Sequence, residues 1–334
     1  MSGGPHREAE QRLPDFPVVD AHHHLCNLSQ HSYPWLERPV EQGFPYHGDD
    51  RPIRRDYLVA DYLDDVGGID LIGSVHIENG AADPRRETAW LADVMRAAPI
   101  PSALVAKVDL LADSAAEDLE WQAAQPGVRG IRQILSWHPD PVYTHTSRPD
   151  IIEDPSWLTN FSRLAALGLS FDLQIYPHQM EQAVVLARTF PDVRIILDHA
   201  GMPISRTEPG LDHWREQMRR LARCENVVCK ISGIGTQDHD WTVDSIRPIV
   251  LGAVEAFGPD RTMFASNFPV DRLYSSFTRL YAAFSELTAA FSAEERDQLF
   301  ASTATEVYRL GPVTGLPLCR RRTRRGGHPR RRTM

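Results

Sequence analysis

The sequence predicts a single α/β domain of the (β/α)8, or TIM-barrel, class. Eight short apolar runs recur along the chain, and a helical pattern follows each of them. The runs are apolar along nearly their whole length, as in parallel strands that are covered on both faces. Eight such units in one domain favour a closed barrel, and an open doubly wound sheet is the alternative.

The predicted strands are 18–22, 71–78, 103–109, 128–135, 169–176, 193–199, 226–233 and 261–268. The predicted helices are 57–66, 84–98, 115–124, 156–167, 178–190, 214–223 and 245–257, followed by two closing helices at 275–287 and 293–310. Helical spacing places Leu91, Val94 and Met95 on one apolar side of 84–98, and Gly168 supplies a C-terminal cap for 156–167. Long loops at 25–55 and 136–155 follow the first and fourth strands, and we expect them to carry substrate specificity.

Length and charge bound the class of protein. The chain has 334 residues, 42% of them hydrophobic, which is ample for a large core. We expect a flexible segment at 1–15, the barrel at 16–311 and a disordered basic tail at 312–334, which holds eight arginines and no acid. Without those arginines the net charge falls from -9 to -17. The rest of the chain is therefore strongly acidic, which argues against an enzyme that acts on nucleic acids.

Several other features indicate a cytoplasmic protein that acts on a small molecule. No apolar run reaches the ~18 residues of a membrane-spanning helix, and the polar start has no signal-peptide core. The four cysteines form no C-x-x-C pair, so we interpret them as reduced thiols. The oligomeric state stays open, with a homodimer as one prediction.

The first strand ends in the most informative motif, Asp20-Ala21-His22-His23-His24. Side chains alternate along a strand, so we expect Asp20, His22 and His24 on one side and His23 on the other. Two imidazoles two residues apart at the end of a buried strand can both reach one divalent ion. A His-rich turn, or histidines satisfied by the core, is the alternative.

Polar residues recur where the predicted strands end, at the edge that carries the active site in TIM barrels. Besides His22 and His24 they are His76, Glu78, Lys107, Asp109, Arg132, Asp172, Gln174, Tyr176, His199, Lys230, Ser232 and Asn267. Packing alone does not explain them, because buried charges must be paired or ligated. His199 is the best third metal ligand, and a histidine bonded to a loop carbonyl is its alternative.

Two charged residues of this set have two interpretations each. Glu78 adds an oxygen ligand to the metal, or it forms an ion pair with a barrel cation such as Lys107 or Arg132. Arg132 offers a planar fork to a substrate carboxylate, or it forms a structural salt bridge. His76 and Glu78 alternate onto one face, so both could enter the site together.

Several motifs in order along the chain resemble the amidohydrolase superfamily, and within it the branch of sugar-lactone and dicarboxylate-lactone hydrolases. They are the start at Asp20 to His24, Tyr33-Pro34-Trp35-Leu36, Gly130-Ile131-Arg132-Gln133, Asp198-His199-Ala200-Gly201-Met202-Pro203, Lys230-Ile231-Ser232-Gly233 and Ser266-Asn267-Phe268-Pro269. The resemblance spans about 17–310 and implies a distorted TIM barrel. It also implies His22 and His24 as first-strand ligands and His199 as a third metal or substrate group.

The chain departs from this family at the eighth strand. The superfamily places an aspartate there, which orients and deprotonates the attacking water, whereas this chain has Asn267. A neutral amide cannot act as a general base near pH 7. Asp271, on the following loop, is our candidate, with Glu78 and Asp172 as other carboxylates. The superfamily's strand-four lysine has no counterpart, because Arg132 occupies that strand.

We therefore expect a metal-dependent hydrolase of a lactone or similar cyclic ester of a small polar or carboxylated acid. His22, His24, Glu78 and His199 are the predicted ligands of a divalent metal, zinc first, with iron or manganese as alternatives. Asp271 takes the proton from water, while Lys230 and Arg132 hold a carboxylate or the developing oxyanion. Trp35, Tyr176 and Asn267 are predicted to contact the substrate, with Trp137 and Tyr143 as further candidates for the pocket wall.

Three other functions stay open on the same scaffold. A two-iron oxygenase would use His22, His24, His76, Glu78, His199 and Asp271, a nitrogen- and carboxylate-rich set that iron accepts. Non-oxidative decarboxylation is known for related barrels. A non-catalytic binding protein with the same barrel is the third, although many ionisable side chains at the strand ends favour an enzyme.

Overall fold

The computed structural model describes residues 13–39 and 45–311. The predicted tail at 312–334 and most of the predicted flexible segment at 1–15 lie outside this part of the chain. Eight parallel strands form one sheet, each pairing with the next along the chain. They are β1 (Val18–His23), β2 (Leu71–Ile77), β3 (Ala103–Lys107), β4 (Val128–Ile134), β5 (Ser170–Gln174), β6 (Ile195–Leu197), β7 (Val227–Ile231) and β8 (Thr262–Phe264).

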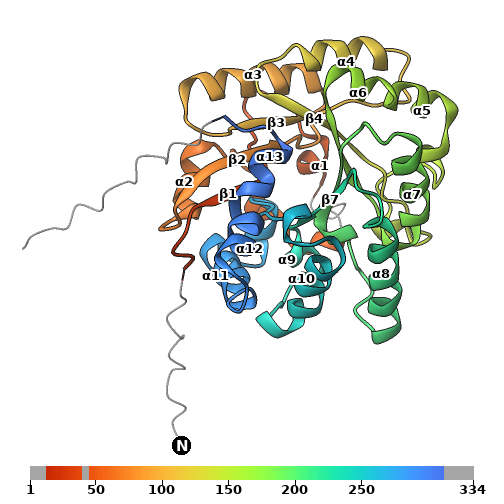
Figure 1. Cartoon of the computed structure of the whole chain (residues 1–334). Helices are drawn as coiled ribbons and strands as arrows, with labels where there is room; N and C mark the ends of the chain where they lie inside the picture. The colour runs from red at the N-terminus through yellow and green to blue at the C-terminus, as the bar shows by residue number, and fades with distance from the viewer. Residues whose placement is uncertain (1–12, 40–44, 312–334) are drawn as a thin grey trace, which may run out of the picture.

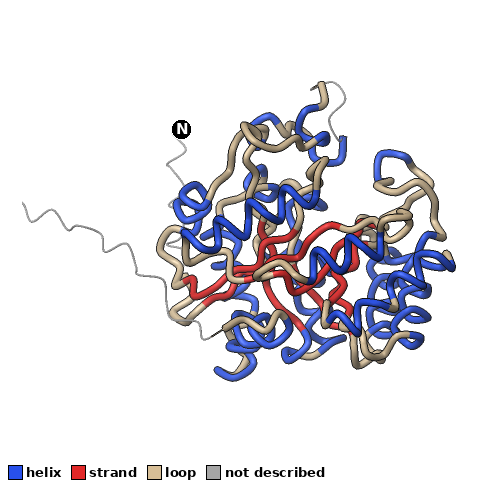
Figure 2. The backbone as a smooth tube through the Cα atoms, turned by 90° about the horizontal axis from the view of Figure 1, so that it is seen from above, coloured by secondary structure: helices blue, strands red, loops and turns tan. Residues whose placement is uncertain are grey.

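The sheet closes on itself where β1 and β8 end. Phe268, just beyond β8, forms a parallel bridge with His23. The His24 N–H donates to the Phe268 carbonyl at 2.7 Å, and the Asn267 N–H donates to the His22 carbonyl at 2.8 Å. The strands occupy the centre of the molecule and the helices surround them (Figures 1 and 2). The prediction of a TIM barrel is confirmed.

The helices follow the predicted order. They are α1 (Pro34–Glu37), α2 (Val59–Val66), α3 (Pro84–Ala97), α4 (Ala115–Ala123), α5 (Pro155–Phe161), α6 (Arg163–Leu167), α7 (Met180–Thr189), α8 (Glu208–Leu221), α9 (Ile234–Gln237), α10 (Val243–Phe257), α11 (Phe277–Leu287), α12 (Ala293–Asp297) and α13 (Thr303–Val307). The short helices α1 and α9 lie in loops that follow β1 and β7, so the sequence pattern did not predict them.

Three helical segments differ from the prediction. The segment 156–167 forms two helices, α5 and α6, which end as predicted at Gly168 with a left-handed φ of 64°. Helix α8 begins six residues earlier than predicted, because the Thr207 hydroxyl caps the Gly210 N–H and Pro209 suits a first turn. The last predicted helix is divided by a π-helical turn at Gln298–Ser302.

The core has two layers around the barrel wall. Inside, Val19, Val75, Val105 and Ile196 are buried together with Tyr308, which directly follows α13. Outside, apolar side chains between strands and helices form the larger cluster, which includes Trp157, Trp214, Tyr62 and Phe277. The packed interior leaves the carboxyl ends of the strands as the place where polar side chains gather.

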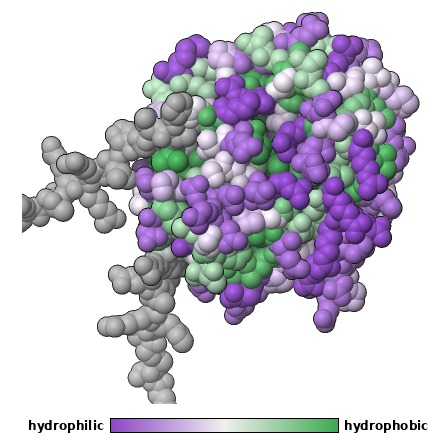
Figure 3. Space-filling view, viewed as in Figure 1, coloured by the Kyte–Doolittle hydropathy of each residue, from purple (hydrophilic) through white to green (hydrophobic). Residues whose placement is uncertain are grey.

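Hydrophilic residues cover much of the face in Figure 3, with apolar residues scattered between them. Of the large hydrophobic side chains in the described ranges, Leu58, Leu63 and Val185 are the ones exposed. No helix in residues 13–39 and 45–311 is long and apolar enough to cross a membrane. The homodimer stays a prediction.

Candidate active site

The motif at the end of β1 does not alternate regularly. The pairing of β1 with β2 shifts register between Asp20 and His23. Because of this irregularity, two successive side chains, those of Ala21 and His22, both point into the barrel. Asp20 points outward with His23, since both contact Tyr62 of α2. The prediction that Asp20 shares a side with His22 and His24 is therefore wrong.

Asp20 instead holds the barrel closed. Its carboxylate accepts hydrogen bonds from the Ser266 N–H at 2.7 Å, the Ser266 hydroxyl at 2.6 Å and the Tyr62 hydroxyl at 2.8 Å. Burial raises the pKa of this carboxyl, and the hydrogen bonds from Ser266 partly oppose the rise. The contacts tie β1 to the segment after β8, which positions the histidines on one side and Asn267 on the other.

Three imidazoles meet at the carboxyl ends of β1 and β6. The ring centre of His22 lies 5.0 Å from that of His24 and 4.8 Å from that of His199. Burial lowers the pKa of His24 to about 3 and that of His199 to about 4, and it lowers the pKa of His22 well below its usual value. All three rings are neutral at pH 7, so each keeps a nitrogen lone pair.

Each ring is oriented through its Nδ1 atom. His24 Nδ1 lies 2.8 Å from the Ile77 carbonyl, and His199 Nδ1 lies 2.8 Å from the Ser232 hydroxyl. His22 Nδ1 lies 3.6 Å from Asp198 and 3.4 Å from the Lys230 ammonium, while its Nε2 is buried without a partner. Such contacts hold the rings of metal-ligating histidines in place.

Gly233 makes room for His199. It has a φ of +61°, and a Cβ atom at this position would lie 2.8 Å from His199 Nδ1. We expect Gly233→Ala to displace the imidazole of His199 and to reduce kcat/KM of the expected lactone hydrolysis at least tenfold. Small misplacements of reacting groups cost about 10²-fold in rate. Gly168→Ala is the matched control, because Gly168 has a φ of +64° with no atom within 4 Å of the added Cβ. Equal activities of the two variants would show that Gly233 is needed only for its backbone conformation and not to make room for His199.

A buried charge network lies beneath His22. The Lys230 ammonium is fully buried and lies 2.6 Å from Asp172 and 3.1 Å from Asp198. Tyr308 donates to the same Asp172 oxygen at 2.8 Å. Burial raises the pKa of Asp172 to about 6, whereas Lys230 and His22 overcome the burial of Asp198 and hold its pKa well below its usual value.

This network corrects the expected role of Lys230. Its ammonium has no exposed surface and is enclosed by Asp172, Asp198, His22 and Tyr308, so it cannot contact a substrate as placed. It does not line the cavity described below. Lys230 instead supports the His22 ring from below. The alternation of side chains along a strand does not predict this depth of burial, which depends on the neighbouring strands.

Glu78 and Arg132 form the ion pair that was one of their two interpretations. Arg132 Nε donates to Glu78 Oε1 at 2.7 Å, and one guanidinium NH2 group donates to the Glu78 carbonyl at 2.5 Å. The second carboxylate oxygen accepts from the Gly80 N–H at 2.8 Å. Both oxygens of Glu78 are therefore engaged, and the structure does not direct them to the histidines. His76 points away as well, toward His23 and the Leu25 carbonyl.

Asn267 stands between the histidines and Asp271. It has a left-handed φ of 59°, and its side-chain amide lies 3.3 Å from His24 Nε2 and 3.5 Å from Asp271 Oδ1. The other oxygen of Asp271 accepts from the Gly235 N–H at 3.5 Å. Burial raises the pKa of Asp271 to about 7. Asp271 does not curl into the mouth as expected, but lies directly behind Asn267.

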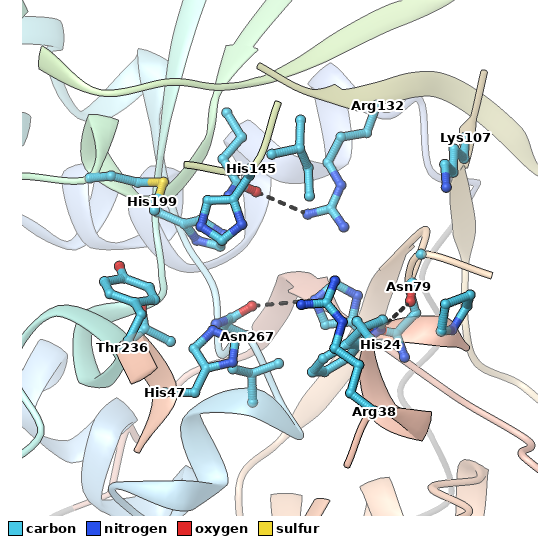
Figure 4. Close-up of a pocket in the computed structure, with 18 residues that line it drawn as sticks. His24, Arg38, His47, Asn79, Lys107, Arg132, His145, His199, Thr236 and Asn267 are labelled. Carbon is cyan, nitrogen blue, oxygen red and sulfur yellow. Dashed lines mark hydrogen bonds between the residues drawn. The ribbon is translucent and has the colours of Figure 1, made fainter. Parts of the chain in front are cut away.

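These residues border a cavity of about 350 Å³. Its wall includes His24, Trp35, Lys107, Arg132, His199 and Asn267, and no Asp or Glu is among its described lining residues (Figure 4). Trp35 donates its indole N–H to the Asn79 carbonyl at 2.7 Å, which fixes the ring at the wall. Tyr176 is fully buried and donates to the Tyr143 carbonyl, so its expected contact with substrate is not present.

The sequence did not single out several residues of the cavity. Arg38 and His145 reach it from loops, His47 from a 3-10 turn and Thr236 from the short helix α9. They follow no alternating or helical pattern, because irregular backbone decides which loop side chains turn inward. Of the loop residues that the sequence did single out, Trp35 lines the cavity, whereas Trp137 and Tyr143 are not among its described lining residues.

The donor chemistry fits a single divalent ion. Neutral imidazoles with a supported Nδ1, together with the unpartnered Nε2 of His22, are suitable ligands. In the described part of the chain, however, no group of three or more His, Cys, Asp or Glu side chains stands close enough, as placed, to hold a metal ion. The carboxylates and His76 that a second iron would need are engaged elsewhere, so the arrangement does not favour a two-iron oxygenase.

Together the barrel, the imidazoles and the polar cavity are typical of a TIM-barrel enzyme. The family model described as amidohydrolase matches residues 19–310, and the chain belongs to this family. An uncharacterized protein of Sinorhizobium fredii, y4mH, is 40% identical over 303 residues, which are 89% of this chain and 100% of that protein.

A sequence and a crystal structure from Burkholderia multivorans extend the comparison. An L-fucono-1,5-lactonase is 28% identical over 306 residues, which cover 87% of this chain and 96% of the lactonase. A crystal structure of an amidohydrolase with bound zinc superposes with a TM-score of 0.73 and 26% identity, over 89% of this chain and 100% of the other. The predicted family is therefore confirmed.

Proposed function

We propose that the chain hydrolyses a lactone, or a similar cyclic ester, of a small polar acid. One observation carries the proposal: Arg132 and neutral imidazoles border one cavity, and Asp271, whose pKa burial raises to about 7, lies one side chain behind its wall. Ester hydrolysis needs donors for the carbonyl oxygen and an acceptor for the proton of water. The relative named L-fucono-1,5-lactonase supports this class of substrate.

The cavity suits a ring of modest size. Its volume of about 350 Å³ lies at the small end of the range for small-molecule sites. The indole of Trp35 supplies a flat apolar wall, and Asn267 supplies a polar contact at the same cavity.

Arg132 stabilises the oxygen that gains charge. Its Nε and one NH2 group hold Glu78, while the other NH2 group lies 3.5 Å from Gln174, a long contact that a substrate oxygen can replace. Arginine keeps its proton throughout, so it donates to an oxyanion without entering the proton balance. The positive charge is fixed in place before the substrate arrives.

Asp271 accepts the proton in this scheme. Water attacks the carbonyl carbon, its proton passes to the Asp271 carboxylate, and the ring C–O bond breaks. The same proton then returns to the departing ring oxygen, which yields a hydroxy acid and restores the enzyme. Asn267 must turn aside for this transfer, because its amide separates Asp271 from the cavity.

His22, His24 and His199 would hold a divalent metal ion, zinc in the first place and iron or manganese otherwise. When bound, such an ion polarises the substrate carbonyl as a Lewis acid. Glu78 is not part of this proposed set, since Arg132 and the Gly80 N–H engage both of its oxygens. The neutral state of the three imidazoles suits the role at neutral pH.

Metal content tests the ligand set without an activity assay. Elemental analysis of the purified protein is expected to give about one zinc per chain, and His22→Ala should lose at least nine-tenths of it. His178→Ala is the control, because His178 bonds the Trp137 carbonyl away from the cavity. Equal metal in wild type and His22→Ala, or about two irons per chain, would contradict the proposed set.

Hydrolysis itself is measured by proton release from a panel of 1,4- and 1,5-lactones of sugar acids in a pH-stat. We expect ring opening of at least one member above the spontaneous rate, and loss of that activity in His199→Ala. No turnover of any lactone by folded, metal-loaded protein would overturn the proposed function.

A further inference from the structure

Lys107 is a cation at the cavity that the proposed hydrolysis does not use. It is the last residue of β3, it is partly buried, and it lines the cavity. Among residues 13–39 and 45–311 its ammonium has no hydrogen-bond or ion-pair partner. An ammonium that lines a cavity without a partner from the protein is available to bind an anion from solution.

The acidic groups around Lys107 are engaged or neutral. Arg132 holds Glu78, and the side chain of Gln133 together with the Leu111 N–H holds Asp109. Burial, followed by the charge of Glu78, raises the pKa of Glu87 to about 8, and the charge of Lys107 opposes part of this rise, so this carboxyl carries little charge at pH 7. No carboxylate of the described residues therefore forms an ion pair with the Lys107 ammonium at the cavity.

The position of Lys107 leaves room for a reacting ring. Figure 4 shows Lys107 and Asn79 on one side of the cavity, with His199 and Thr236 on the opposite side. The Asn79 main chain bonds Trp35 and Glu87, while its side-chain amide has no hydrogen-bond partner in the described residues. An ammonium and an amide at one end form a suitable pair of donors for a carboxylate.

We propose that the substrate is an anionic lactone, whose free carboxylate binds Lys107 and Asn79 while its ester carbonyl lies near Arg132 and the histidines. This inference rests on the proposed hydrolysis and narrows it to lactones of dicarboxylic hydroxy acids. Lys107 then determines specificity, since a neutral lactone leaves its charge unpaired in the cavity.

Matched pairs of lactones test the proposal. Aldono-1,4-lactones and aldaro-1,4-lactones of the gluco, galacto and manno series differ at C6, where a hydroxymethyl group is replaced by a carboxylate. We expect kcat/KM for the best carboxylated member to exceed that of its neutral partner at least tenfold. Lys107→Met should raise its KM by about 10- to 100-fold, as for loss of a charge-assisted hydrogen bond, with little change in kcat. The neutral partner should lose much less, and Lys107→Arg should recover part of the preference.

A labelling experiment gives a readout besides activity. The chain has two lysines, Lys107 and Lys230, and Lys230 is fully buried. An amine-reactive acylating reagent should therefore modify Lys107 alone among the lysines, as followed by peptide mass spectrometry. Glucarate at millimolar concentration is expected to slow this modification, whereas gluconamide, its neutral analogue, should not.

The outcomes separate this inference from the proposed hydrolysis. Equal or better turnover of neutral lactones, or an equal loss on both partners in Lys107→Met, overturns the anionic substrate while leaving hydrolysis intact. Failure of every lactone, combined with protection of Lys107 by glucarate, overturns the hydrolysis and retains the carboxylate site. Absence of both turnover and protection overturns the two proposals together.

Discussion

Replacing Asp271 by Asn is expected to lower kcat/KM for lactone hydrolysis by about 10²- to 10⁴-fold, the usual contribution of a general base. Burial raises the pKa of Asp271 to about 7, so the carboxylate form that accepts a proton is present above pH 7 and lost below it. Wild-type kcat/KM should therefore rise through pH 7 to a plateau. Asp271→Asn should remove this rise, as measured after subtraction of spontaneous hydrolysis.

Asn267→Asp in the Asp271→Asn background is the matched control. It exchanges the two side-chain types between neighbouring positions and places a carboxylate at the cavity wall beside His24. We expect it to restore part of the activity, since the acceptor then contacts the cavity directly. A wild-type profile that is flat from pH 5 to 8 would instead assign the acceptor role to a group of low pKa, such as His199.

Replacing Arg132 by Met is expected to reduce kcat/KM by about 10²- to 10³-fold, the loss found when one oxyanion donor is removed. It should also lower the free energy of unfolding by about 3–5 kcal/mol, because Glu78 stays buried without its cation. Thermal or urea unfolding measures the second effect separately from the kinetics.

The double variant Arg132→Met/Glu78→Gln separates the two roles of Arg132. The second substitution replaces the unpaired carboxylate with a neutral amide, so most of the lost stability should return while the activity stays low. Recovery of both properties together would mean that Arg132 acts only through folding. Loss of stability without loss of activity in the single variant would exclude Arg132 from the oxyanion contact.

The strand ends show how far pattern alone carries the site. His22, His24 and His199 were predicted to lie together. In the structure the ring centre of His22 lies within 5.0 Å of the ring centres of both His24 and His199. This worked because parallel strands in a barrel end at one edge, so a residue's place in its strand is enough to locate it. The ion pair of Glu78 with Arg132 was predictable as one of two alternatives for the same reason.

The predictions for Asp20, Lys230, Tyr176 and Asp271 show where pattern was insufficient. A register shift in β1 reversed the side of Asp20, and burial removed Lys230 and Tyr176 from the cavity. The left-handed Asn267 put its own amide between Asp271 and the histidines. Each outcome depends on a local irregularity of the backbone or on burial by residues distant in sequence. The spacing of residues along the sequence predicts neither of these.

By itself, the sequence determined the eight-unit barrel and the edge at which His22, His24, His199, Arg132 and Asn267 gather. Apolar periodicity sets these features, because each strand must bury its side chains on both faces of the wall. Only the tertiary structure decided which of the polar residues face the cavity, which pair beneath it, and that Lys107 is left without an anionic partner in the described chain. Those features depend on contacts between residues far apart in sequence, where burial and pairing compete within a few ångströms.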